Sequence, residues 1–203
     1  MNRDSFIRLA LALLLLPALL APPAPAVARE HTSVEAAAPE PGPQSSNIGV
    51  NGFYSVDRAQ QGSSFQAAVV MEIPGGLHVN ANKPLGKYSV PTVVKVDAPR
   101  GFRVTPVSYP RGSVRTFRFG GSEESRIAVY EGRTIFRFNV SVPADQPFGV
   151  ETVRVSVRFQ SCTDEVCYPP ATRNLDLAIG VVGRDAPSNR INGQYFGGGR
   201  RKR

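Results

Sequence analysis

The chain's two cysteines are the residues whose type and spacing suit chemistry. Cys162 and Cys167 are separated by four residues, and Pro169-Pro170 follow shortly after them. A hairpin of that length brings its two ends to about the 5.5–6 Å Cα separation that a disulfide favours. The proline rings stiffen the exit because each fixes its own φ angle. The pair can therefore form a bridge in a surface turn.

Two uses of such a bridge stay open on the residues alone. One is a static structural disulfide in an exported interaction module, because paired cysteines are commonly oxidised in an exported protein. Closing a loop of about six residues, however, stabilises a fold by only about 2 kcal/mol. The other is a redox pair that opens and closes by exchange with a partner thiol. Asp164 and Glu165 inside the loop favour the thiol over the thiolate, which suits a disulfide attacked by a partner or a dithiol activated on docking.

Metal binding is a third alternative. Two thiolates together with His78 or Met71 can hold copper(I) or zinc. The whole sequence contains two cysteines and two histidines, with no CxxC motif and no Met or His cluster beside the pair. We therefore predict no metal and no cofactor. His78 is expected to be a surface or hydrogen-bonded residue rather than a catalyst, although an imidazole titrates near neutral pH.

Short strands surround the cysteines. Residues 153–159 alternate between apolar and polar side chains immediately before Cys162, and residues 175–179 do so after Cys167. Tyr130 and Phe159 are expected in the core. Other strand-like segments lie at 65–73, 77–79, 92–96, 102–105, 127–130 and 134–142. About seven to nine strands, Gly/Pro turns and no helical period after the first segment predict an all-β, immunoglobulin-like antiparallel β-sandwich.

The first segment has the pattern of a secretory signal peptide. Residues 1–28 contain Arg3 and Arg8, an apolar run over residues 9–20, and the small-residue signal Ala26-Val27-Ala28. The run is shorter than the about 20 residues that span a bilayer. We predict cleavage near Ala28 and an exported mature chain that does not span the membrane and lies in an oxidising compartment. An uncleaved anchor is the alternative.

The formal charge of +8 is concentrated at the ends of the chain. Residues 1–28 carry net +1 and residues 184–203 carry net +5, which leaves +2 for residues 29–183. Residues 29–47 are rich in Pro, Ala, Glu and Ser and are predicted to be a disordered linker before a domain at 48–183. Residues 184–203 are predicted to be a disordered, solvated basic tail. The nearly neutral domain argues against a nucleic-acid partner.

The residues around the cysteines resemble a known family. Gln160-Ser161-Cys162 and Cys167-Tyr168-Pro169-Pro170, joined by a short acidic loop, are similar to the active-site turn of the N-terminal periplasmic domain of the thiol:disulfide interchange protein DsbD. Segments 76–85, 90–92 and 129–132 resemble it more weakly. The resemblance covers residues 48–183.

That resemblance implies a thiol:disulfide oxidoreductase of immunoglobulin-like fold that acts as a monomer. It implies a redox pair that receives electrons from a thioredoxin-like or membrane thiol reductase and passes them to periplasmic thioredoxin-fold proteins. By position, Cys167 forms the mixed disulfide with the partner and Cys162 resolves it. The family's membrane and thioredoxin domains are absent from this sequence, so we expect a separate electron donor.

The sequence departs from the family at three points. The cysteine loop is one residue shorter than in typical members. The aromatic residue that caps the family's disulfide falls within residues 115–124, where Phe117 and Phe119 are the candidates. The pair of tyrosines that lines the family's site is replaced in this sequence, and His78 and Asn80 lie nearby in the sequence. Shielding of the disulfide and handling of its protons are therefore expected to differ.

Overall fold

The computed structural model describes residues 47–86, 89–118 and 124–197. The chain divides into two units, Met1–Pro39 and Glu40–Arg203, and every described residue lies in the second. The predicted signal peptide, nearly all of the predicted linker and residues 198–203 lie outside the described residues.

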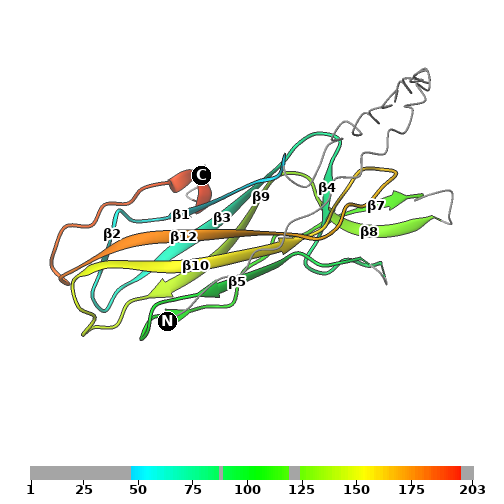
Figure 1. Ribbon diagram of the computed structural model, residues 1–203. Helices are drawn as coiled ribbons and strands as arrows, with labels where there is room; N and C mark the ends of the chain where they lie inside the picture. Colours follow the sequence, from blue (N-terminus) through cyan, green and yellow to red (C-terminus); the bar gives the residue numbers. More distant parts are fainter. Residues whose placement is uncertain (1–46, 87–88, 119–123, 198–203) are drawn as a thin grey trace, which may run out of the picture. The chain divides into compact units, whose positions relative to one another are not determined.

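The described residues form three four-stranded sheets. The first has the order β1 (Gly49–Tyr54), β3 (Ser64–Ile73), β9 (Gly132–Ser141), β6 (Arg103–Val104). The second has the order β2 (Arg58–Gln60), β12 (Ala171–Val182), β10 (Gly149–Phe159), β5 (Val93–Asp97). The third has the order β11 (Ser161–Cys162), β4 (His78–Asn80), β8 (Ser125–Tyr130), β7 (Ser113–Phe117). In Figure 1, β10, β12 and β5 run in front of β3 and β9.

The first two sheets share one core. Alternate residues of β10 point inward, and Val155 and Phe159 are almost fully buried, as the sequence predicted for this strand. They belong to the same apolar cluster as Val69 of β3 and Phe136 of β9. Burying each such side chain contributes about 1.5–3 kcal/mol. Apolar residues of the two facing sheets therefore hold the sandwich together.

These sheets confirm the predicted all-β, immunoglobulin-like sandwich. Among the strand pairs of the described residues, all are antiparallel except β2 with β12. A short 3-10 turn (η3) lies at Gly193–Tyr195. No helix among the described residues has the length and apolar character needed to cross a bilayer.

The C-terminal segment differs from the predicted disordered tail up to residue 197. The Asn189 backbone N–H and Nδ2 each donate to the Asp57 carboxylate at 2.8 Å. Tyr195 stacks on Phe53 with ring centroids 4.2 Å apart, and its carbonyl oxygen accepts a 2.6 Å bond from Arg137 Nε. These contacts are isolated polar and aromatic pairings without a repeating apolar period, so the composition of the segment did not reveal them.

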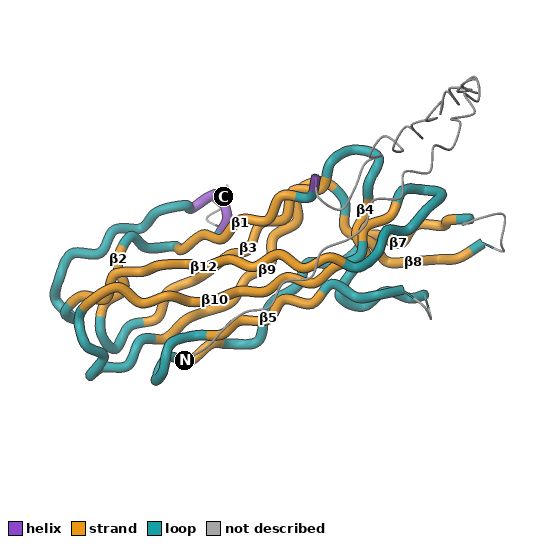
Figure 2. Tube along the Cα trace, in the orientation of Figure 1, coloured by secondary structure: helices purple, strands orange, loops and turns teal. Residues whose placement is uncertain are grey.

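The third sheet carries the cysteines. Figure 2 shows β4, β7 and β8 gathered beyond one end of the long strands β10 and β12. β10 ends at Phe159, and after Gln160 the chain continues as β11, which pairs with β4. The cysteine hairpin is thus the tip of the β10–β12 hairpin, and its β11 strand pairs with β4 of the third sheet.

Candidate functional site

Cys162 and Cys167 are joined by a disulfide, with Cα atoms 4.0 Å apart. This separation is shorter than the sequence suggested, and the backbone gives the reason. The Thr163 N–H donates to Val166 O at 2.8 Å and the Tyr168 N–H donates to Ser161 O at 2.9 Å. The cysteines are therefore a non-hydrogen-bonded antiparallel pair, in which the Cα atoms approach most closely.

A bulge in the hairpin sets this pairing. Phe159 pairs with Ala171, so an unbroken ladder would place Tyr168 opposite Cys162. Cys167 stands there instead, because the strand containing Pro169 and Pro170 has one extra residue. Proline has no N–H to donate and is tolerated at such bulges. The bulge places Cys167 opposite Cys162. The missing ladder bonds cost little free energy, because the two prolines have no N–H groups to donate.

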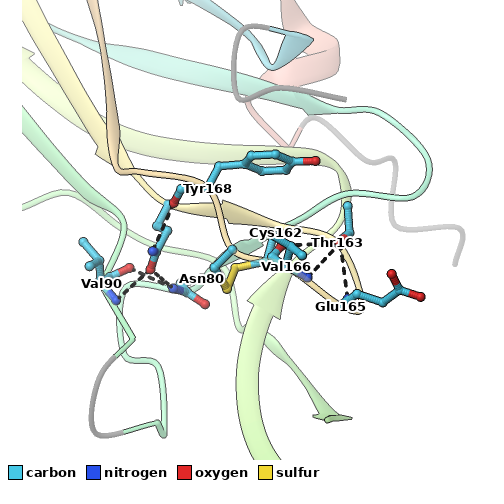
Figure 3. Close-up of a disulfide and its surroundings, with 9 residues drawn as sticks. Asn80, Val90, Cys162, Thr163, Glu165, Val166 and Tyr168 are labelled. Atoms are coloured by element: carbon cyan, nitrogen blue, oxygen red, sulfur yellow. Dashed lines mark hydrogen bonds between the residues drawn. A yellow bond between two sulfur atoms is a disulfide. The ribbon is translucent and has the colours of Figure 1, made fainter. Parts of the chain in front are cut away.

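Thr163 organises the loop between the cysteines. Its Oγ1 accepts hydrogen bonds from the backbone N–H groups of Glu165 at 3.2 Å and Val166 at 3.0 Å, as Figure 3 shows. This is the local turn that threonine commonly makes. Asp164 and Glu165 are exposed, so both acidic side chains lie in solvent.

The two sulfur-bearing residues differ in exposure. Cys162 lies in β11 and is 1% exposed, whereas Cys167 is exposed to solvent. A second molecule can therefore reach the bridge through Cys167 rather than through Cys162.

Gln160 fastens the cysteine hairpin to the rest of the fold. Its Nε2 donates to Tyr168 O at 3.1 Å, and its Oε1 accepts from Asn80 Nδ2 at 3.1 Å and Val90 N at 3.4 Å. Figure 3 shows these bonds on the side of the bridge away from Thr163. Gln160 was recognised in the sequence as part of a motif, but this role was not predicted. The available signal was a polar residue placed where an apolar strand switches sheets.

Asn80 stands in β4 on the same network. It is 2% exposed, and its Nδ2 also donates to Val90 O at 3.2 Å. The Thr92 hydroxyl donates to its carbonyl oxygen at 2.6 Å. These two bonds tie β4 to the segment that follows it, and the Gln160 side chain joins both to the residue before β11.

His78 is placed directly opposite Cys162 in the pairing of β4 with β11. It is 2% exposed, and its ring stacks on Phe117 with centroids 4.2 Å apart. Among the described residues its Nε2 has no hydrogen-bond partner. The expectation of a surface position for His78 is therefore wrong, because the strand register places the ring inside the fold.

Burial lowers the pKa of His78, because an imidazolium loses solvation inside the protein. The nearby carboxylates of Asp164 and Glu131 act in the opposite direction, and Arg115 adds to the lowering. Arg115 Nη1 also donates to Glu131 at 3.0 Å. The net result is a ring that stays neutral more readily than a solvated histidine.

The other residues that the sequence singled out have the following places. Tyr130 and Phe159 are buried as predicted, and the Tyr130 hydroxyl donates to Asn82 Oδ1 at 2.9 Å. Phe117 is buried against His78, whereas Phe119 lies outside the described residues. Met71 is fully buried in the main core. Within the described residues, no group of three or more His, Cys, Asp or Glu side chains is arranged to hold a metal ion.

Sequence comparison identifies a family. The family model for the N-terminal region of the thiol:disulfide interchange protein DsbD matches residues 51–179, which is more than half of the chain. No curated protein matches the chain significantly.

Solved structures give weaker likenesses. The reduced DsbD N-terminal domain of Neisseria meningitidis is 18% identical, with 70% of this chain and 88% of that chain covered and a TM-score of 0.38. The N-terminal periplasmic domain of ScsB from Proteus mirabilis is 14% identical, with 70% and 51% covered and a TM-score of 0.44. The complex between the DsbD and PilB N-terminal domains from Neisseria meningitidis matches at 18% identity, with 61% and 80% covered and a TM-score of 0.37.

Proposed function

The chain belongs to the family of the N-terminal domain of the thiol:disulfide interchange protein DsbD, and on that premise we propose that it relays reducing equivalents through Cys162 and Cys167. The observation that carries the proposal is the unequal exposure of two bridged cysteines. A partner sulfur can reach Cys167 from solvent, while Cys162 is the buried leaving group.

Reduction of the pair takes two exchange steps. A donor thiolate attacks Sγ of Cys167, which breaks the bond to Cys162, joins the donor to Cys167 and leaves the electron pair on the Cys162 sulfur. A second donor thiolate then attacks the donor sulfur of this mixed disulfide and releases Cys167. Two electrons and two protons have entered the pair.

Transfer to a client reverses the roles. The Cys167 thiolate attacks the client disulfide and forms a mixed disulfide, with one client sulfur leaving as a thiolate. Cys162 then attacks Cys167, restores the internal bridge and releases the second client thiolate. Cys167 is thus the residue joined to partners, and Cys162 is the resolving residue.

The partners follow from the family. The proposed donor is a thioredoxin-like or membrane thiol reductase, the acceptors are thioredoxin-fold proteins, and the compartment is the periplasm. The domain would act as a monomer, with each partner docking in turn on the end that carries Cys167.

The redox potential of the Cys162–Cys167 couple tests the proposal against a static bridge on the same fold. We expect a value above about −300 mV, because structural disulfides lie below that value. A potential well below it would make the bridge structural and defeat the relay.

Trapping tests the assignment of roles. Reduced Cys162→Ser should form a stable mixed disulfide with a thioredoxin that lacks its resolving cysteine and carries thionitrobenzoate, the leaving group, on its remaining cysteine. Cys167→Ser is the matched control. Faster or more complete trapping through Cys162 would reverse the assignment.

A further inference from the structure

The resolving step has a physical difficulty at Cys162. Only a thiolate attacks a disulfide, and burial disfavours the charged form of a thiol. Cys162 is 1% exposed, so bulk water does not reach its sulfur to remove a proton. Resolution therefore requires a proton acceptor inside the site.

His78 occupies the position such an acceptor needs. Residues directly opposite each other on antiparallel strands carry side chains on one face, with Cβ atoms about 4.5–5.5 Å apart. His78 and Cys162 are such a pair. The stacked Phe117 ring holds the imidazole in place.

The state of the ring nitrogen points to the thiol. In the oxidised chain, His78 Nε2 is buried and unpartnered among the described residues. An unsatisfied buried polar atom destabilises a fold. A disulfide sulfur has no hydrogen to offer, but reduction creates an S–H group on Cys162, directly across the strand pair. In the tautomer that carries its hydrogen on Nδ1, Nε2 needs a donor, and the Cys162 S–H group supplies one when the bridge opens.

The surrounding charges suit a ring that is neutral at rest and can take a proton. Burial keeps the imidazole neutral, and the Asp164 carboxylate in the cysteine loop favours the imidazolium once it forms. Glu131, which follows β8, acts in the same direction as Asp164, whereas Arg115 of β7 opposes them. Arg115 and Glu131 are paired with each other at 3.0 Å, so their effects on the ring partly cancel.

We propose, on the basis of the proposed relay, that His78 is the general base for Cys162 and accepts its S–H proton during resolution. As the proton moves to Nε2, the Cys162 sulfur attacks Sγ of Cys167, the internal S–S bond forms, and the Cys167–client bond breaks. The client sulfur leaves with the electron pair, and the imidazolium then returns its proton to that thiolate or to water. In the opposite direction the imidazolium protonates Cys162 as it leaves.

A single-turnover reaction separates the steps. The reduced full chain is mixed with an aromatic disulfide (dithiobis-nitrobenzoate), whose thiolate product absorbs visible light. The first thiolate is released when Cys167 attacks, and the second when Cys162 resolves the adduct. His78→Gln should slow the second phase by about a hundredfold, at the lower end of what general base catalysis contributes, and leave the first unchanged.

The pH profile distinguishes proton transfer from loosened packing. In the wild type the second phase should rise with pH and level off once His78 is neutral, whereas in His78→Gln it should keep rising into alkaline solution. The matched control is Ser161→Ala. Ser161 is also buried with an unpartnered Oγ, but consecutive strand residues face opposite sides, so this change should leave the second phase unaltered.

The outcomes separate the two proposals. A second phase in His78→Gln with the wild-type rate and pH profile overturns the role of His78 while leaving the relay intact. Equal slowing in Ser161→Ala also overturns it, because packing would then explain both variants. Absence of the first phase in the wild type defeats the relay itself.

Discussion

Replacement of Gln160 by alanine should loosen the cysteine hairpin at a calculable cost. The side chain makes two hydrogen bonds at 3.1 Å, to Tyr168 O and from Asn80 Nδ2, and a weaker one at 3.4 Å from Val90 N. A neutral hydrogen bond contributes about 0.5–1.5 kcal/mol net. Asn80 keeps its second bond, to Val90 O, and the half-buried Tyr168 can recruit water. We therefore expect Gln160→Ala to lower the free energy of unfolding by about 2–3 kcal/mol.

Urea unfolding of the full chain measures this cost, with the midpoint shifted and the m-value unchanged. The matched control is Gln160→Glu, which keeps an acceptor for Asn80 and Val90 but loses the donor to Tyr168. Its cost should be smaller than that of the alanine variant. The loss should be of similar size in the oxidised and reduced protein, because the three bonds do not involve sulfur. A loss of unfolding free energy of only about 0.5 kcal/mol in Gln160→Ala, the range of ordinary surface substitutions, would show that Gln160 does not hold the hairpin in place.

Two further predictions concern other parts of the fold. Gly112→Ala should destabilise by about 1–3 kcal/mol, because a Cβ would lie 2.7 Å from the Ala81 Cβ; Gly180→Ala, with open space around it, is the neutral control in the same urea assay. Hydrogen bonds from Asn189 lower the pKa of Asp57. The Asp57 carboxylate therefore stabilises the fold fully at pH values above the ordinary aspartate pKa of about 3.9, and this stabilisation is lost as the pH falls through the lowered pKa. Asp57→Asn should flatten that acid limb of the unfolding free energy; an unchanged limb would contradict it.

The sequence predicted the features that depend on residues close together in the chain. The alternation over residues 153–159 predicted β10 and its buried face, and the short spacing of the cysteines predicted their bridge. Both signals are local, because side-chain direction alternates along a strand and a short loop limits where its ends can lie.

What the sequence did not reveal depends on pairing between distant residues. No local pattern says that His78 lies across from Cys162, because that register arises only when β4 and β11 meet. The same holds for the C-terminal segment, where Asp57 and Asn189 are joined by side-chain hydrogen bonds rather than by an apolar repeat. Only a three-dimensional structure shows such contacts.

The contacts that hold the hairpin in place do not involve the S–S bond, so we expect the fold to survive reduction of the bridge. A loop of this size gains only about 2 kcal/mol from closure, so reduction removes little stability. The groups that hold the hairpin in place are Gln160, the pairing of Ser161 with Val79 and the core around Phe159. None of them depends on the S–S bond. We infer that Cys162 stays opposite His78 in both redox states, which is the condition under which a buried thiol can be deprotonated and the bridge closed again.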